Sequence, residues 1–238
     1  MLKYCYGLDS YMRHRGVADL LKKHCPRSAE ILDVGGEVSI SSNHIGRFVK
    51  GHKITTANIR PESDVEFKGG VLPFADDAFD TVITVDTVEH VPPRQRQAWL
   101  RELFRVSRKL VIIAGPISNE FNREADRYLS DLYERLHGKP HQLAEHVING
   151  RPTIAEIEAW DEIARPFVRT AEGIQFDGDS RIWKRQYGTI FRIDTKRGLL
   201  RIVLKMTYLM WTMFGLRPLR FTKSLGEYTQ RFYVAYVC

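Results

Sequence analysis

Short apolar runs alternate with amphipathic stretches through the first half of the chain. Runs rich in β-branched residues predict buried strands over 30–34, 53–59, 79–86 and 109–114. Apolar residues at helical spacing predict helices over 10–24, 41–50 and 92–107. Strands that alternate with helices of this length predict an α/β fold whose mostly parallel sheet is covered by helices on both faces.

The pattern changes after Pro116. Apolar residues at helical spacing predict a long helix over 121–136, which Gly138 ends. Thr153 and Glu156 form a capping box for a second helix. Two further strands are expected over 166–170 and 231–237, with a basic and aromatic insertion over 176–228 between them.

The stretch 31–37 reads I-L-D-V-G-G-E, a buried strand that breaks into a tight turn. Such a turn often holds a nucleotide, but the residues that follow do not spell G-x-G-x-x-G. Taken alone, the stretch fits either a ligand-binding turn or an ordinary strand end.

Composition limits the classes of protein that need to be considered. With 238 residues and 43% apolar content, the chain is long enough for one large domain with a full core. A net charge of +7 favours an anionic partner such as nucleic acid, a nucleotide-linked substrate or a phospholipid surface. No run of five Lys or Arg occurs, so nucleic acid is the weaker expectation, and a merely soluble basic surface remains open.

Cysteine usage and the first residues bear on the compartment. The three cysteines lack paired spacing, which argues against a disulfide framework and against a zinc site. Charged residues interrupt the first 16 positions, so no signal peptide is expected and the predicted location is cytoplasmic.

The stretch V-L-P-F-A-D-D-A-F-D-T-V-I-T-V-D-T-V-E-H-V-P-P, over 71–93, resembles class I S-adenosylmethionine (SAM) dependent methyltransferases. With I-L-D-V-G-G, it covers residues 30–115 in the order of that family. A looser likeness, carried by L-A-E-H-V-I-N-G-R-P (143–152) and the last strand, is to methyltransferases that accompany surface-glycan biosynthesis.

The resemblance implies a Rossmann-like class I methyltransferase fold in a single domain, 1–238. Its cofactor-binding core would be 26–116, and the segments 117–165 and 176–228 would be helical insertions that form a lid on the acceptor side. The implied cofactor is SAM. Residues expected to bind it are Asp33, Gly35, Gly36, Glu37, Asn58, Ile59, Val71, Leu72, Asp86 and Thr87.

These positions have different expected roles. The glycine turn would sit beside the methionine part, Val71 and Leu72 would flank adenine, and Asp86 and Thr87 would line the methyl-transfer side. Asn58 stands where the family usually has an acidic residue for the ribose hydroxyls. Because a neutral acceptor loses the charge-assisted part of such bonds, Asn58→Asp is expected to tighten SAM binding.

Glu145 and His146 are the candidates for acid/base catalysis, with His90 as the competing base. A histidine can take a proton from a hydroxyl at neutral pH, and a neighbouring carboxylate can orient it. Packing under the lid and helix capping are the alternatives. No metal site is expected, because His141 and Glu145 are the only pair at i,i+4 spacing here.

The segment 206–216 is uncharged but too short to span a bilayer. With basic residues around it, the region 199–220 is predicted to contact an anionic membrane peripherally, at its inner face, or else to be a buried lid.

The predicted function is O-methylation of a sugar in a glycan or glycan precursor, with SAM as methyl donor. The acceptor would be a small molecule or a glycan. The alternatives are a catalytically weak binding module that associates with glycan enzymes or a membrane, and a nucleic-acid methyltransferase. Neither the methylated atom nor the oligomeric state follows from the sequence.

Overall fold

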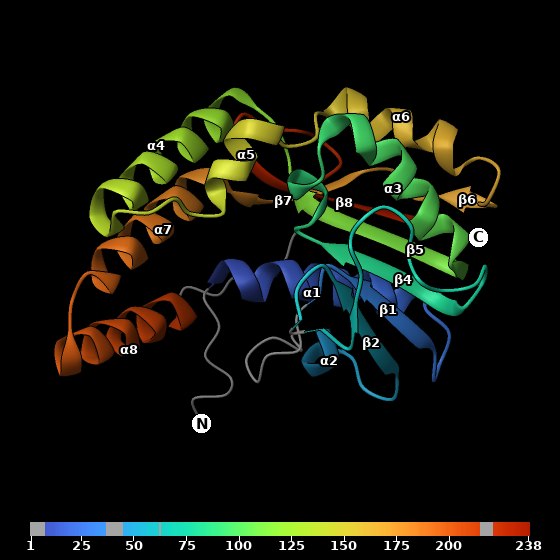
Figure 1. The fold of residues 1–238 in the computed structure, drawn as a ribbon, viewed down its shortest axis with the longest axis horizontal. Coiled ribbons are helices and arrows are strands. Elements are labelled where there is room, and N and C mark those ends of the chain that lie inside the picture. The colour runs from blue at the N-terminus through green and yellow to red at the C-terminus, as the bar shows by residue number, and fades with distance from the viewer. Residues whose placement is uncertain (1–7, 37–44, 62, 215–220) are drawn as a thin grey trace.

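A central, mostly parallel sheet organises the protein, for which we analysed a computed structural model (Figure 1). The structure describes residues 8–36, 45–61, 63–214 and 221–238. Its strands are β1 Glu30–Val34, β2 Lys53–Asn58, β3 Val65–Glu66, β4 Phe79–Val85, β5 Ser107–Pro116, β6 Thr170–Ala171, β7 Gln175–Asp179 and β8 Thr229–Val237. They lie in the order β3-β2-β1-β4-β5-β8-β6, and β7 also pairs with β8.

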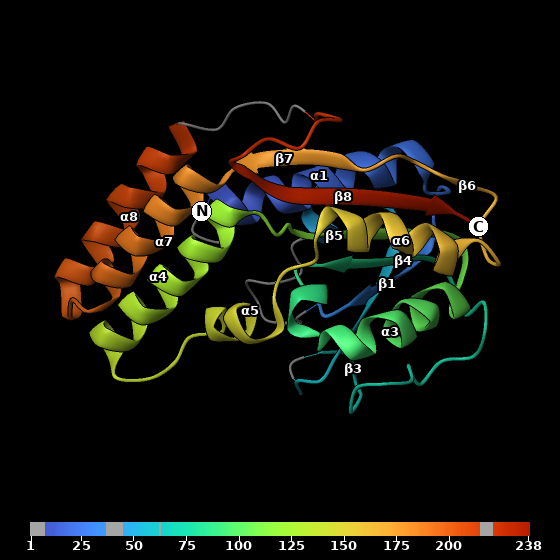
Figure 2. The ribbon, with the colours of Figure 1, turned by 90° about the horizontal axis from the view of Figure 1, so that it is seen from above.

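Helices cover both faces of this sheet (Figure 2). They are α1 Leu8–His24, α2 Ile45–Phe48, α3 Pro93–Arg105, α4 Glu120–His137, α5 Leu143–Asn149, α6 Ile154–Ala164, α7 Ser180–Asp194 and α8 Gly198–Phe214. On one face, α3 and α6 bury Leu103 and Trp160 against the strands. On the other face, α1 and α2 bury Leu21 and Ile45 in a separate cluster. The predicted two-faced α/β architecture is confirmed.

The direction of the chain changes between β1 and β4. The path runs from β1 outward to β2 and β3, then returns to place β4 on the opposite side of β1, and all these neighbours pair in parallel. At such a switch point the loops leave in opposite directions and open a crevice at the carboxyl ends of the strands. Gly35 and Asp86, which follow β1 and β4, therefore lie at the expected ligand edge.

Several element boundaries differ from the sequence-based prediction. The strand predicted over 166–170 is wrong except at its last residue, because the amides of Phe167 and Val168 continue the end of α6 by donating to Ala164 O. Strand β7 was not predicted, although it pairs with β8 in register from Gln175 to Asp179. The helix predicted over 41–50 is described only as the short α2, and the start of that prediction lies outside the described residues.

The helices of the first predicted insertion, 117–165, lie in two different parts of the molecule. Helices α4, α7 and α8 form a lobe at one end of the molecule, beside the sheet (Figures 1 and 2). Helix α6 instead covers the sheet with α3. Thr153 Oγ1 accepts from Glu156 N at 3.2 Å, as its predicted cap requires, while the Glu156 carboxylate pairs with Arg96 at 3.0 Å. The division into core and lid stays a prediction.

Candidate active site

The glycine turn after β1 is tightly built against β4. Gly35 adopts φ +88°, and a Cβ added there would lie 2.1 Å from Thr87 Oγ1. A Cβ on Gly36 would lie 2.6 Å from the carboxyl carbon of Asp33. Glycine at both positions therefore lets the backbone turn between two side chains that the sequence analysis expected at the cofactor site.

Asn58 completes this turn from the end of β2. Its side-chain amide donates to Gly35 O at 2.9 Å and to Gly36 O at 3.2 Å. A carboxylate at this position could not donate and would face two carbonyl oxygens. The expectation that Asn58→Asp tightens SAM binding is thus reversed by the local geometry, and only Asn58 Oδ1 is left for a cofactor hydroxyl.

Asp86 is held between two arginines that sequence reasoning missed. It adopts φ 51°, and its carboxylate accepts from Arg13 of α1 and from Arg231 of β8. Burial alone would raise the pKa of Asp86, but the two guanidinium groups hold it well below its usual range. Asp86 therefore joins three elements at the ligand edge as a fixed, charge-compensated group.

The predicted adenine-flanking residues have opposite environments. Val71 is largely exposed, as is Ile59 beyond the end of β2. Leu72 is buried in the core with Trp99, and its amide donates to Glu102 Oε2 at 2.9 Å. Its contact with adenine stays a prediction, and its side chain would have to move outward to make it. The loop turns inward there because Arg105 donates to Leu72 O and Phe74 O. Glu37, also predicted at the site, lies outside the described residues.

Asp33 is the penultimate residue of β1, two positions before Gly35. Burial raises its pKa to about 7, so a large fraction of this carboxyl is protonated at neutral pH. A protonated carboxyl can donate as well as accept a hydrogen bond. Asp33 therefore offers both kinds of contact beside Gly36.

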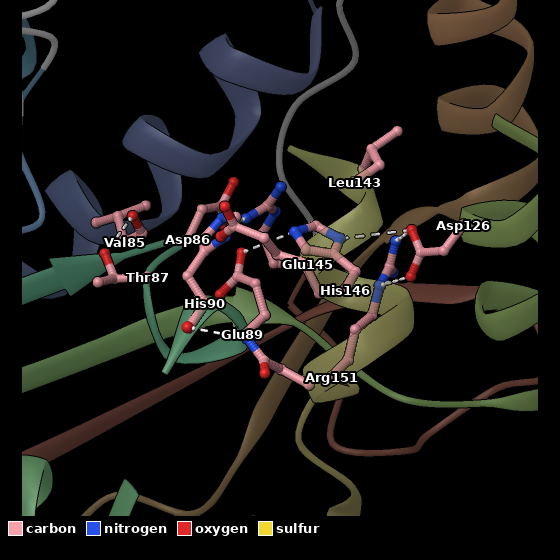
Figure 3. Close-up of polar contacts among 12 residues, drawn as sticks. Val85, Asp86, Thr87, Glu89, His90, Asp126, Leu143, Glu145, His146 and Arg151 are labelled. Carbon is pink, nitrogen blue, oxygen red and sulfur yellow. Dashed lines mark hydrogen bonds and ion pairs between the residues drawn. The ribbon is translucent and has the colours of Figure 1, made fainter. Parts of the chain in front are cut away.

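A polar cluster follows directly along the chain, in the one-turn 3-10 helix Val88–His90 (Figure 3). His90 Nδ1 lies 2.6 Å from Glu145 Oε2 on α5. The His146 ring lies 5.0 Å from that of His90, centroid to centroid, and its Nε2 is 3.9 Å from Glu89 Oε1. The three predicted acid/base residues therefore come together, but Glu145 pairs with His90 and not with its sequence neighbour His146.

Glu89 is the member of this cluster that was not among the predicted acid/base residues. It is 1% exposed, and its Oε2 is buried with no hydrogen-bond partner among the described residues. Burial, and next the negative charge of Asp86, raise the pKa of Glu89 to about 7. A buried carboxyl with such a pKa can hold or release a proton at neutral pH. The E-H-V order after β4 was the signal that could have identified it.

The buried ion pair between Asp126 and Arg151 lies beside the Nδ1 atom of His146. His146 Nδ1 lies 3.5 Å from Asp126 Oδ1. Arg151 donates two hydrogen bonds to the Asp126 carboxylate, at 2.7 and 2.6 Å. Burial would raise the pKa of Asp126, but the Arg151 charge and the His146 contact keep it below its usual value. The Arg151 guanidinium also lies 4.8 Å from the centre of the Trp183 ring. Helices α4, α5 and α7 thus fix the histidine together.

Three side chains of this cluster are of types that also bind metal ions. Ligand atoms of Glu89, His90 and His146 lie within 4.8 Å of one another in the described part of the chain. At a bond length near 2.1 Å, two ligands of one zinc ion are at most about 4.2 Å apart. Small side-chain movements would bring the three ligand atoms within this limit, so the expected absence of a metal site stays a prediction.

Comparison with known proteins agrees with the fold. Residues 38–114 match a family described as a methyltransferase domain, a segment that begins just after the glycine turn. No curated protein matches the chain significantly.

Solved structures that resemble the chain are distant in sequence. The YcgJ protein of Bacillus subtilis is 14% identical with a TM-score of 0.51, covering 94% of this chain and 97% of its own. A phosphoethanolamine N-methyltransferase of Haemonchus contortus, solved with phosphomonomethylethanolamine and S-adenosylhomocysteine, is 13% identical with a TM-score of 0.53. That match covers 92% of this chain and 51% of the other.

The sheet order, the switch-point turn and the family match together define the class. The chain has the Rossmann-like class I methyltransferase fold, and its residues 38–114 match the methyltransferase-domain family. The cofactor of methyltransferases with this fold is SAM, and the described residues fit that group: a glycine turn where no Cβ has room, Asn58 Oδ1 for a hydroxyl, and exposed apolar side chains at Ile59 and Val71.

Proposed function

We propose that the protein transfers a methyl group from SAM to a hydroxyl oxygen of a sugar, in a glycan or a glycan precursor. The observation that carries this proposal is Glu89, buried with an unpartnered oxygen and a pKa near 7, beside His146. A hydroxyl acceptor has to lose its proton as the new bond forms, so a base poised near neutral pH suits it.

SAM supplies an electrophilic methyl group on a positively charged sulfur. The chain's own residues then have two tasks, alignment and proton removal. We assign alignment to the more exposed pair His90–Glu145, whose polar atoms can bond the neighbouring hydroxyls of a sugar. The proton of the reacting hydroxyl passes to the Glu89–His146 pair, and Asp126 orients the imidazole through its Nδ1 side.

The position of the cluster along the chain supports this assignment. Thr87 lies against the glycine turn, and Glu89 follows only two residues further along the chain. One short segment after β4 therefore carries both a residue next to the proposed cofactor site and the proposed proton acceptor. The sugar itself rests on the looser resemblance of 143–152 to methyltransferases of surface-glycan biosynthesis. The proposal also includes a cytoplasmic location, peripheral to the inner face of a membrane through 199–220.

The test is a transfer assay with the full chain and SAM labelled in its methyl group. The acceptor panel contains nucleotide sugars, free oligosaccharides and lipid-linked oligosaccharides, with phosphoethanolamine and RNA as competing classes. We expect label on a sugar oxygen, located by mass spectrometry, together with release of S-adenosylhomocysteine. Label only on an amine or on RNA contradicts the proposed acceptor. Calorimetric SAM binding without transfer to any sugar favours the catalytically weak module.

A further inference from the structure

The positive charge of the chain is concentrated in helices α7 and α8. Residues 180–214 hold eight Lys or Arg and one Asp, a net charge of +7, which equals the net charge of the whole protein. The remaining residues carry 28 charges of each sign. These two helices form one end of the molecule, with α4 beside them (Figures 1 and 2). An anionic partner is therefore attracted to that end.

Helix α8 turns its apolar side outward. The exposed large apolar side chains among its described residues are Leu199, Leu200, Ile202, Val203 and Met210, and Leu199 is 75% exposed. The charged residues Arg201 and Lys205 instead reach Asp194 at the end of α7, at 3.4 and 2.6 Å. An ordinary surface helix buries its apolar stripe, whereas here apolar side chains are exposed beside the charged ones.

An outward apolar face on a basic helix narrows the choice of partner. Nucleic acid is bound mainly through cations that point at phosphates, and aliphatic side chains add little to that. A helix that lies in a membrane interface has apolar residues toward the acyl chains and basic residues among the headgroups. No acidic residue occurs between 195 and 214, and Lys196 and Arg197 are exposed just before the helix.

A spanning role for α8 does not fit its dimensions. It has 17 residues, and no helix among the described residues is both long and apolar enough to cross a bilayer. The apolar residues Leu199, Val203 and Met210 follow i, i+4 and i+11 spacing, so they form one stripe along the helix. A stripe of this kind suits a helix lying parallel to the membrane plane.

We propose that the exposed apolar face of α8, defined by Leu199, Leu200, Ile202, Val203 and Met210, docks on a phospholipid bilayer that contains anionic lipids. The apolar face enters the boundary between headgroups and acyl chains, and Lys196 and Arg197 contact the anionic headgroups. The docking does not depend on the acceptor, so its failure would leave the proposed methyl transfer standing.

The experiment measures co-sedimentation of the full chain with two kinds of vesicle. One is phosphatidylcholine alone, and the other is an equimolar mixture of phosphatidylcholine and phosphatidylglycerol. We expect binding to the mixed vesicles only, decreasing as salt is raised, because salt screens exposed charges. Leu199→Glu with Val203→Glu should lower the partition coefficient at least tenfold. Ile148→Glu, at an 80% exposed aliphatic residue of α5, is the matched control and should leave binding unchanged.

Two further measurements keep the result interpretable. Circular dichroism and SAM titration check that each variant is folded. Lys196→Gln with Arg197→Gln should weaken binding to mixed vesicles severalfold, and unchanged binding would contradict the headgroup contacts. Equal recovery of the wild-type chain in both supernatants overturns the proposal. So does a wild-type dimer that Leu199→Glu with Val203→Glu dissociates, since a second copy then covers the face, or RNA binding that the same double variant abolishes.

Discussion

At the scale of single residues, Glu89 combines deep burial with a side chain that can accept a proton. Its carboxyl is enclosed, lacks a partner for Oε2 among the described residues, and lies next to His146. We predict that Glu89→Gln lowers turnover on the order of 10²-fold, because the amide cannot take a proton, while SAM affinity stays within about threefold. Steady-state kinetics and calorimetry measure the two effects. Glu145→Gln, on the exposed side of the cluster, should cost less, and a fully active Glu89→Gln would remove Glu89 from the mechanism.

Asn58 gives a second prediction at this scale, opposite in sign to the one that the sequence suggests. Its amide is the donor that holds the carbonyls of Gly35 and Gly36. We predict that Asn58→Asp weakens SAM binding about tenfold or more, since a hydrogen bond is lost at each carbonyl and repulsion replaces it. Calorimetry with SAM measures this, and Asn58→Ala, which loses the bonds without repulsion, should be affected less. Tighter binding in Asn58→Asp would mean that the turn rearranges around the ligand.

The sequence predicted which residue types gather at this edge but not how they pair. Strand ends after β1 and β4 follow from hydrophobic pattern, so Asp33, Gly35 and Asp86 could be placed. Arg13 and Arg231 could not, because each lies far from Asp86 in the chain and only the packing of α1 and β8 brings them there. Glu145 pairs with His90 and not with His146 for the same reason. The direction of the Glu145 side chain depends on how α5 packs beside Val88–His90.

At the scale of elements, the Asp126–Arg151 pair connects α4 to the segment after α5. Both side chains are buried and joined by two short bonds. We predict that Arg151→Met lowers the free energy of unfolding by about 3–5 kcal/mol, because it leaves the Asp126 charge uncompensated in the interior. Urea denaturation measures this. The double variant Arg151→Met with Asp126→Leu should recover part of the loss, and an equal loss in both would assign the effect to packing against Trp183.

Elements were predicted best where a local pattern determines them. Strand β1 and the capped start of α6 were placed correctly because β-branched runs and capping residues act over a few positions. Helix α5 was not predicted as a separate element, since its seven residues bury only Leu143 and show little periodicity. Strand β7 was missed because its ladder with β8 joins residues 50 to 58 positions apart.

At the scale of the whole molecule, the buried carboxyl groups give stability a defined dependence on pH. The folded-state pKa of Glu89 is raised to about 7 from an ordinary value of 4.5, with Asp86, His146 and Arg231 as the charged groups around it. The folded protein therefore keeps a proton that the unfolded chain releases between these values. This stabilisation is complete below about pH 4.5 and is lost as pH rises through about 7. The clamped carboxylates Asp86 and Asp126 have lowered pKa values and act oppositely, losing their contribution only as pH falls below about 4.

We therefore predict that the free energy of unfolding, measured by urea denaturation at constant ionic strength, is higher near about pH 5.5 than near about pH 8. At roughly 1.4 kcal/mol per pH unit between about pH 5.5 and the folded-state pKa near 7, Glu89 accounts for about 2 kcal/mol of this fall. Glu89→Gln keeps the neutral form at every pH, so its stability should decline less over this range, the remaining decline coming from Asp33, whose pKa is raised in the same direction. At about pH 8 this variant should be more stable than the wild type, although it is the less active protein. Parallel pH curves for the two proteins would show that Glu89 titrates normally in the fold, and the proton acceptor would then have to be His146 alone.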